Sequence, residues 1–277
     1  MDYSAADVKR LREQTGAGML DCKNALVEAP DYEAAVEILR VKGAKDVNKR
    51  AQRTAAQGLV TAVLDGHSAG ILLELNCETD FVAKTDLFQQ VAADIARAAL
   101  AGSAQDRLAV LGLEVRPGQT TQQLIEEAGA SLKEKVELGR FARFAGGYVT
   151  SYLHKSDPAL PPTLGVLVQL ESESADTGQD VAHQVAAMSP RWVTRDDVPG
   201  DVVAGERRIA EQMTREEGKP EAAIPKIVDG RVNAFLKDTV LVEQASVRDS
   251  KKTVKQLLAE RGARVIGFAR FQIGQAG

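Results

Sequence analysis

The chain has 277 residues, 44% of them apolar, which is enough to bury a core and excludes wholesale disorder. Its 35 basic and 39 acidic residues give a net charge of −4, which argues against a protein that coats nucleic acid over its whole surface. With two cysteines, three histidines and 4% aromatic residues, the chain lacks a disulfide framework, a multi-histidine metal centre and extended platforms for stacking bases.

The N-terminal segment is charged and lacks the apolar run of a signal peptide, and no stretch approaches the roughly 18 apolar residues of a membrane span. We therefore expect a soluble, cytoplasmic protein with no membrane partner. The first fifty residues show three helical patterns, separated by Gly16-Ala17-Gly18 and by Pro30-Asp31. Three short amphipathic helices bury little apolar surface alone, so residues 1–53 are predicted to form a small module with one face left for a partner.

A basic stripe follows the third of these patterns. Lys42, Lys45, Lys49 and Arg53 fall along one side of a helix that is predicted to link the module to the rest of the chain. Such a stripe is typical of a solvated helix surface, and it also fits contact with phosphate or with an acidic partner. The sequence leaves both interpretations open.

The composition then changes to strand-like patterns. Residues 59–64 and 70–76 are apolar and β-compatible, and the Asp65-Gly66 pair between them is a strong signal for a hairpin turn. The apolar side chains that alternate onto one face of the second strand are Ile71, Leu73 and Leu75. A helix is predicted next, with Asp86 and Gln89 spaced as a capping box at its start.

A similar arrangement returns later in the chain. Gly70–Leu75 resembles Gly165–Leu170, and Gln90–Ala93 resembles Gln184–Ala187 at nearly the same offset. Two hairpin-plus-helix units at one offset predict an α+β fold whose core is duplicated.

An insertion interrupts the second unit. Gly218-Lys219-Pro220 breaks a charged stretch that has narrow apolar seams on both sides, which is the pattern of an antiparallel helical hairpin projecting from the body. The predicted domain boundaries are 54–139 for the first half of the core, 140–190 with 238–277 for the second half, and 191–237 for the hairpin.

Catalytic motifs are absent from the sequence, which has no phosphate-binding loop, dinucleotide fingerprint, nucleophile elbow or HExxH zinc motif. Cys77 with His67 or His154 could be imagined as a nucleophilic pair, but Cys77 ends an apolar strand, where a buried packing thiol is expected. Glu78 and Asp80 have too common a spacing to indicate acid–base catalysis. We therefore predict a protein that is not an enzyme and that needs no metal ion or cofactor.

The segment Thr79–Lys84 joins the second strand to the next helix and carries Phe81 between charged residues. A large aromatic side chain there can be a staple folded onto its own helix. It can also be a presented anchor that enters an apolar pocket of a partner, where burial contributes roughly 2–3 kcal/mol. The residues alone leave both interpretations open.

Several longer motifs occur together in one known family. They are Val8–Arg12, Thr15–Met19, Asp21–Lys23, Asn76–Lys84, Gly165–Val168, Gly218–Pro220 and Phe268–Phe271. On these motifs, over essentially the whole chain, the sequence resembles the family of bacterial translation elongation factor Ts. The resemblance implies an N-terminal three-helix ubiquitin-associated-like module, a duplicated core and an inserted helical hairpin. The sequence departs from the family pattern at Leu20, where many members carry a second Met. Residues Gly102–Gly118 match no specific motif of the family.

The resemblance implies guanine-nucleotide exchange on elongation factor Tu, which would be bound in its GDP-bound and nucleotide-free states. Asp80 and Phe81 would enter the partner's nucleotide-binding domain as a loop, with Phe81 as an apolar wedge and Asp80 as an acidic element beside it. Together they would disturb the partner's Mg²⁺ and phosphate contacts, so that GDP leaves faster. Thr79 and Val82 would shape this loop.

Further contacts are implied outside this loop. Met19, Leu20 and Lys23 of the N-terminal module resemble the family's second contact patch on the partner. His154 resembles a third contact, and an ordinary core or surface histidine fits its position equally well. No direct contact with nucleic acid is implied, and a homodimer through the hairpin or the core is left open.

Two other functions are compatible with parts of the sequence. A ubiquitin-associated-like scaffold without exchange activity would function without the Thr79–Val82 segment. An RNA-binding protein would use Lys42–Arg53 and would lose affinity steeply as salt rises. An enzyme, in contrast, would need Cys77 or a histidine for turnover.

Overall fold

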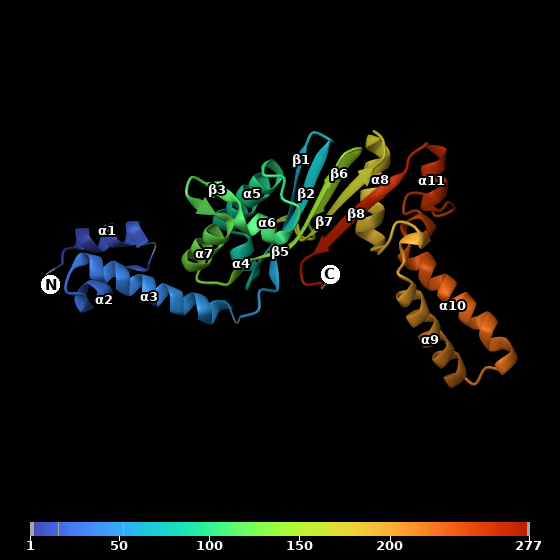
Figure 1. Ribbon diagram of the computed structural model, residues 1–277, viewed down its shortest axis with the longest axis horizontal. Helices are drawn as coiled ribbons and strands as arrows, with labels where there is room; N and C mark the ends of the chain where they lie inside the picture. The colour runs from blue at the N-terminus through green and yellow to red at the C-terminus, as the bar shows by residue number, and fades with distance from the viewer. Residues whose placement is uncertain (1–2, 16, 52, 276–277) are drawn as a thin grey trace.

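Three helices form the N-terminal end of the computed structural model, which describes residues 3–15, 17–51 and 53–275 (Figure 1). They are α1 (Ala5–Thr15), α2 (Met19–Glu28) and α3 (Tyr32–Ala51). Their apolar faces meet in a small core that includes Leu11, Cys22, Leu26 and Leu39. The predicted linker helix is the continuation of α3, and the side chains of Lys45 and Lys49 lie outside the described residues.

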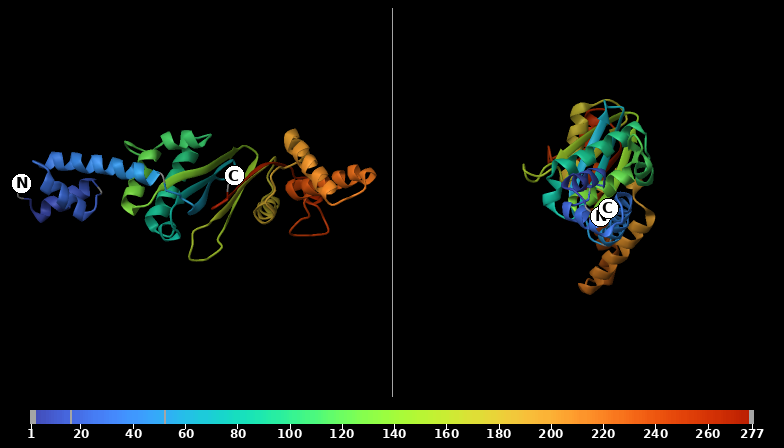
Figure 2. Two further views of the ribbon diagram at one scale, coloured as in Figure 1. Left: turned by 90° about the horizontal axis from the view of Figure 1, so that it is seen from below. Right: turned by 90° about the vertical axis from the view of Figure 1, so that its left-hand side faces the viewer.

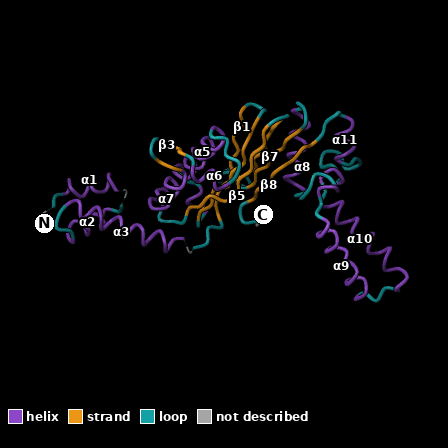
Figure 3. Tube along the Cα trace, viewed as in Figure 1, coloured by secondary structure: helices purple, strands orange, loops and turns teal. Residues whose placement is uncertain are grey.

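Two three-stranded antiparallel sheets form the centre of the molecule (Figure 3). The first sheet has the order β1 (Gln57–Asp65), β2 (Ala69–Cys77), β5 (Val136–Ala145). The second has the order β6 (Tyr148–His154), β7 (Leu164–Leu170), β8 (Val265–Gln272). In each sheet a hairpin supplies two strands, and the third strand pairs with the second strand of that hairpin. The mixture of helices and antiparallel sheets confirms the predicted α+β class.

Helices cover the outer faces of the two sheets. Those on the first sheet are α4 (Asp80–Ala83), α5 (Asp86–Ala101), α6 (Arg107–Gly112) and α7 (Thr121–Leu132), with a small ribbon of β3 (Glu114–Arg116) and β4 (Gln119–Thr120) beside them. The helix α8 (Ala175–Met188) covers the second sheet, and α11 (Val254–Glu260) packs into the same core.

The inner faces of the sheets pack against each other. Ile71, Leu73 and Leu75 lie on the helical side of β2, as the alternation predicts, and Leu72 points into the core between the sheets. The members of that inter-sheet core include Val60, Leu72, Val149, Leu167 and Phe271. The central strand β2 is therefore buried on both faces.

Two glycines in equivalent register let the sheets come close. Gly70 pairs with Leu64 and Phe144 in the first sheet, and Gly165 pairs with Leu153 and Phe271 in the second. A Cβ atom on Gly70 would lie 3.0 Å from a methyl of Val149, and one on Gly165 would lie 2.5 Å from a methyl of Val60. Any side chain at either position would push the sheets apart.

The helices α9 (Gly200–Glu216) and α10 (Ile224–Thr239) lie side by side and project from the second half of the core (Figure 1, Figure 2). The chain reverses direction between them at Gly218, whose φ of 68° suits a residue without a side chain. Buried apolar side chains form the seam between the two helices, among them Ala210, Ile224, Val228, Val232 and Leu236. The ion pairs Arg207–Asp229 and Glu217–Arg231 span the same seam.

Two expectations about boundaries differ from the structure. The predicted border between residues 139 and 140 falls inside β5, which stays paired with β2 up to Ala145. The capping box of Asp86 and Gln89 is wrong by one residue, because the hydroxyl of Thr85 accepts a hydrogen bond from the Phe88 amide at 3.3 Å and so caps α5. No helix in the part of the chain that the structure describes is long and apolar enough to cross a membrane.

Candidate functional site

The segment predicted as a loop at Asp80 and Phe81 is a single helical turn, α4, between β2 and α5. The hydroxyl of Thr79 caps this turn by accepting a hydrogen bond from the Val82 amide at 3.3 Å. Val82 and Ala83 are buried in the core of the first half, so the underside of α4 is anchored. Because one side of the turn is buried, the opposite side must face away from the core.

Phe81 lies on that opposite side and is 76% exposed. The staple interpretation is therefore wrong for the free protein, since a stapled ring would be covered by its own helix. The ammonium of Lys84 lies 5.7 Å from the centre of the Phe81 ring and 3.1 Å from the carboxylate of Asp80. Asp80 and Lys84 are both partly exposed, so α4 presents an aromatic ring with a weak ion pair beside it.

Glu134, which the sequence analysis did not single out, holds the start of α4. Its carboxylate accepts hydrogen bonds from the backbone amides of Glu78 and Thr79 at 3.1 and 3.0 Å and from the Thr79 hydroxyl at 2.6 Å. Glu134 follows α7 and is distant in sequence from Thr79. No motif or periodicity connects the two positions, so only the fold brings them together.

Cys77 lies buried beneath α4, where its thiol donates a hydrogen bond to the carbonyl oxygen of Thr79 at 3.1 Å. Burial, reinforced by the negative charge of Glu134, raises the pKa of Cys77 to about 12. The thiol is therefore protonated at neutral pH, which fits a packing role and not a nucleophile. His67, its imagined partner, instead stacks on the Tyr148 ring with centroids 4.3 Å apart.

The N-terminal candidate residues lie together on α2. Met19, Leu20 and Lys23 are all exposed, while Cys22 and Leu26 on the other side of the same helix face the small core. The helix α2 thus has one buried apolar face and a second apolar surface in contact with solvent. Such a surface is typical of a contact site for another protein.

His154 is exposed at the end of β6. Its Nδ1 atom shares a hydrogen bond with the Tyr152 hydroxyl at 2.9 Å. The structure thus brings Thr79, Asp80, Phe81 and Val82 together on one turn, while the α2 residues and His154 lie on separate elements (Figure 1).

The basic stripe is partly engaged within the chain. Lys42 forms an ion pair with Asp21 at 2.7 Å, and Arg53 forms one with Glu78 at 3.1 Å. Among residues 3–15, 17–51 and 53–275, no group of three or more histidine, cysteine, aspartate or glutamate side chains is arranged to hold a metal ion.

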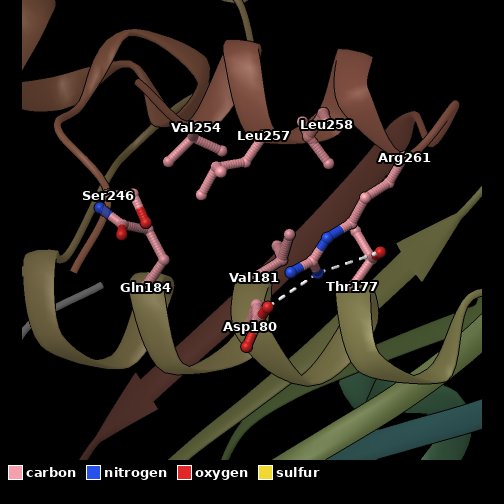
Figure 4. A pocket seen from close by; sticks show the side chains of 9 residues that line it. All are labelled: Thr177, Asp180, Val181, Gln184, Ser246, Val254, Leu257, Leu258 and Arg261. Atoms are coloured by element: carbon pink, nitrogen blue, oxygen red, sulfur yellow. Dashed lines mark hydrogen bonds and ion pairs between the residues drawn. The ribbon is translucent and has the colours of Figure 1, made fainter. Parts of the chain in front are cut away.

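A narrow cleft between α8 and α11 is too small for a substrate. Its volume is about 20 Å³, room for roughly one water molecule. Arg261 reaches across it to Asp180 at 2.7 Å (Figure 4). Asp180 also pairs with Arg248, so its charge is used to join α8 to the segments around α11.

Comparison with known proteins identifies the family of the chain. Residues 78–275 match the family described as Elongation factor TS. The chain is 55% identical over 276 residues to Elongation factor Ts of Thermobifida fusca, 58% over 274 residues to that of Acidothermus cellulolyticus and 50% over 275 residues to that of Streptomyces coelicolor. Each of these alignments covers 99% of this chain and 99% of the relative. The chain therefore belongs to the elongation factor Ts family.

Proposed function

We propose that this protein is the guanine-nucleotide exchange factor for elongation factor Tu and that α4 enters the partner's nucleotide-binding domain to promote GDP release. Membership of the elongation factor Ts family supports the exchange role in translation elongation. The observation that carries the proposed mechanism is Phe81, a large apolar side chain held in solvent on an anchored helical turn.

The exposed ring favours binding because it is already in position. Burying Phe81 in a partner's apolar pocket contributes roughly 2–3 kcal/mol. The backbone of α4 loses little conformational freedom on docking, since Val82 below the ring is fixed in the core. The ring therefore acts as a preformed wedge.

Asp80 supplies the charge beside this wedge. Its ion pair with Lys84 is exposed and contributes at most about 1 kcal/mol, so it opens at little cost when α4 docks. The freed carboxylate would then compete with the nucleotide's phosphates for Mg²⁺ and for nearby cations of the partner. In this mechanism the metal and the nucleotide belong to the partner, and this chain needs no cofactor.

A single aromatic ring does not account for the whole effect. Moving a two-state equilibrium from one side to the other takes a differential affinity of about 10⁴, which corresponds to about 5.5 kcal/mol. We therefore assign further contacts with the partner to Met19, Leu20 and Lys23 on α2 and to His154 at the end of β6. Since coupling between sites is reciprocal, GDP and Mg²⁺ weaken the binding of this protein to the GDP-bound partner by the same factor, and the nucleotide-free partner binds best.

Replacement of Phe81 tests this function. Phe81→Ala should slow the release of fluorescent GDP from elongation factor Tu about 30-fold or more in stopped-flow measurements, because about 2 kcal/mol of binding to the nucleotide-destabilised state is lost. Leu108→Ala is the matched control, since Leu108 is 75% exposed on α6 of the same half and is no part of the proposed contact.

The control should exchange nucleotide at the wild-type rate. Unchanged exchange by Phe81→Ala would refute the wedge, whatever the effect of the substitution on the melting temperature. A homodimer through the α9–α10 hairpin or the core stays a prediction, which light scattering of the free protein tests.

A further inference from the structure

Two glutamates exchange hydrogen bonds between the start of α4 and the start of β5. Glu134 accepts from the amides of Glu78 and Thr79, at 3.1 and 3.0 Å, and from the Thr79 hydroxyl at 2.6 Å. In return, the carboxylate of Glu78 accepts from the amide of Lys135 at 2.6 Å. Each carboxylate therefore holds the backbone of the segment that carries the other. We call these four bonds the glutamate clamp.

The clamp matters because α4 is too short to be stable alone. A helix of four residues has not recovered the cost of nucleation, so its shape depends on what surrounds it. The core holds Val82 from below, and the Thr85 hydroxyl donates to the Val82 carbonyl from the far end at 2.8 Å. Glu134 holds the near end, and it does so with charge-assisted hydrogen bonds, which are the stronger kind.

Glu134 also sets the orientation of the capping side chain. The Thr79 hydroxyl donates a hydrogen bond to Glu134, and the same oxygen accepts a hydrogen bond from the Val82 amide. Removing the carboxylate frees the hydroxyl to rotate away, and the cap is then lost together with the two amide bonds. The direction in which the Phe81 side chain points from the turn depends on the cap and on both amide hydrogen bonds.

We propose that Glu134 is a positioning residue for nucleotide exchange, which fixes the segment from Glu78 to Val82 so that Phe81 is presented in its binding conformation. This inference rests on the exchange function proposed above. Without the clamp, only a fraction of molecules carries α4 in the competent shape, and the apparent dissociation constant rises by the reciprocal of that fraction. Once bound, the partner itself holds α4, so the maximal exchange rate stays close to the wild-type value.

The test measures two quantities separately: the concentration of this protein that gives half-maximal GDP release, and the maximal rate of GDP release. Glu134→Gln keeps the size of the side chain but leaves one acceptor oxygen for three donors. We expect the concentration of this protein that gives half-maximal GDP release to rise about tenfold, with the maximal rate within about twofold of wild type. Glu126→Gln is the matched control, since Glu126 is exposed on α7 and contacts Gln122, not α4.

Variants of the cap provide an independent arm. Thr79→Val removes the hydroxyl and should reproduce the shift in half-saturation, whereas Thr79→Ser retains the hydroxyl and should shift half-saturation much less. Hydrogen exchange on the free protein should be faster at the Thr79 and Val82 amides in Glu134→Gln and at the Val82 amide in Thr79→Val, while the melting temperature falls by only a few degrees.

Two results would overturn the proposal. One is an unchanged half-saturation in Glu134→Gln, and the other is a fall in its maximal rate as large as that of Phe81→Ala. If the wild-type chain does not accelerate GDP release at all, the exchange function fails and the role of Glu134 in it fails too. In that case hydrogen exchange on the free protein still decides whether the clamp holds α4.

Discussion

The ion pair between Glu74 and Arg140 offers a sharp test of how a buried charge contributes to the stability of the core. Glu74 lies on β2 and is 6% exposed. Its carboxylate accepts a hydrogen bond from the Nε of Arg140 at 2.6 Å. The same guanidinium donates to the carbonyl oxygen of Gln272 at 2.7 Å and lies 5.0 Å from the centre of the Phe271 ring. Arg140 of the first sheet therefore binds the last strand of the second.

Replacing Arg140 with methionine keeps the aliphatic stem and removes the charge. The buried carboxylate of Glu74 is then left unpaired, which costs about 3–5 kcal/mol. The lower end, about 3 kcal/mol, is expected because 24% of the Arg140 side chain is in contact with water. At about 2–4 °C per kcal/mol, the melting temperature should fall by about 6–12 °C.

The double variant Glu74→Leu/Arg140→Met tests whether the unpaired buried charge causes the loss of stability. It removes both charges, so its free energy of unfolding should return to within about 1 kcal/mol of wild type. Urea unfolding followed by circular dichroism measures all three proteins. A single variant that loses less than about 1 kcal/mol, or a double variant as unstable as the single, would refute a buried charge as the source of the effect.

Two further predictions concern acid stability and backbone strain. The hydrogen bond from Arg195 lowers the pKa of Glu243 at the base of the α9–α10 hairpin. The ionised carboxylate therefore stabilises the folded protein at pH values above the ordinary carboxyl pKa of about 4.3. This stabilisation is lost as the pH falls through the lowered pKa of the folded state. Thermal melts from pH 6 down to about pH 3 should show this loss, and Arg195→Gln should remove that part of the pH dependence. Gly58→Ala should cost more than about 2 kcal/mol in urea unfolding, because φ is 147° and the new Cβ would lie 2.1 Å from the Leu75 carbonyl oxygen. Gly66→Ala, at a φ of 53° with open space around it, should cost only about 1 kcal/mol, and equal losses would contradict the steric argument.

Elements with a local signal were predictable from the sequence. The Asp65-Gly66 turn and the alternation of Ile71, Leu73 and Leu75 correctly indicate a hairpin with one face toward a helix. The second buried face of β2 was also encoded, since the run Gly70–Leu75 is almost continuously apolar. Its partner, the other sheet, lies too far along the chain for any local pattern to identify.

The candidate site was only partly predictable. The resemblance singled out Phe81, but four residues are too few to show a helical period, so α4 was expected to be a loop. The cap of α5 was misplaced because Asp86 and Thr85 are both good capping residues, and only the observed hydrogen bond to the Phe88 amide distinguishes them. Glu134 gave no signal, since its contacts with Thr79 arise from the fold and not from sequence spacing.

The short connection between the N-terminal helices and the first sheet has a consequence for partner binding. Since α3 ends at Ala51 and β1 begins at Gln57, the exposed surface of α2 and the ring of Phe81 are carried on one chain with a brief tether between them. In the complex proposed above, once either surface has bound the partner, the other meets it at an effective concentration that is in the millimolar range for short tethers. The combined avidity can then exceed either separate affinity by about 10²–10⁴. Two surfaces that each bind weakly would therefore bind the partner tightly together, and the complex would still dissociate because each contact can break by itself.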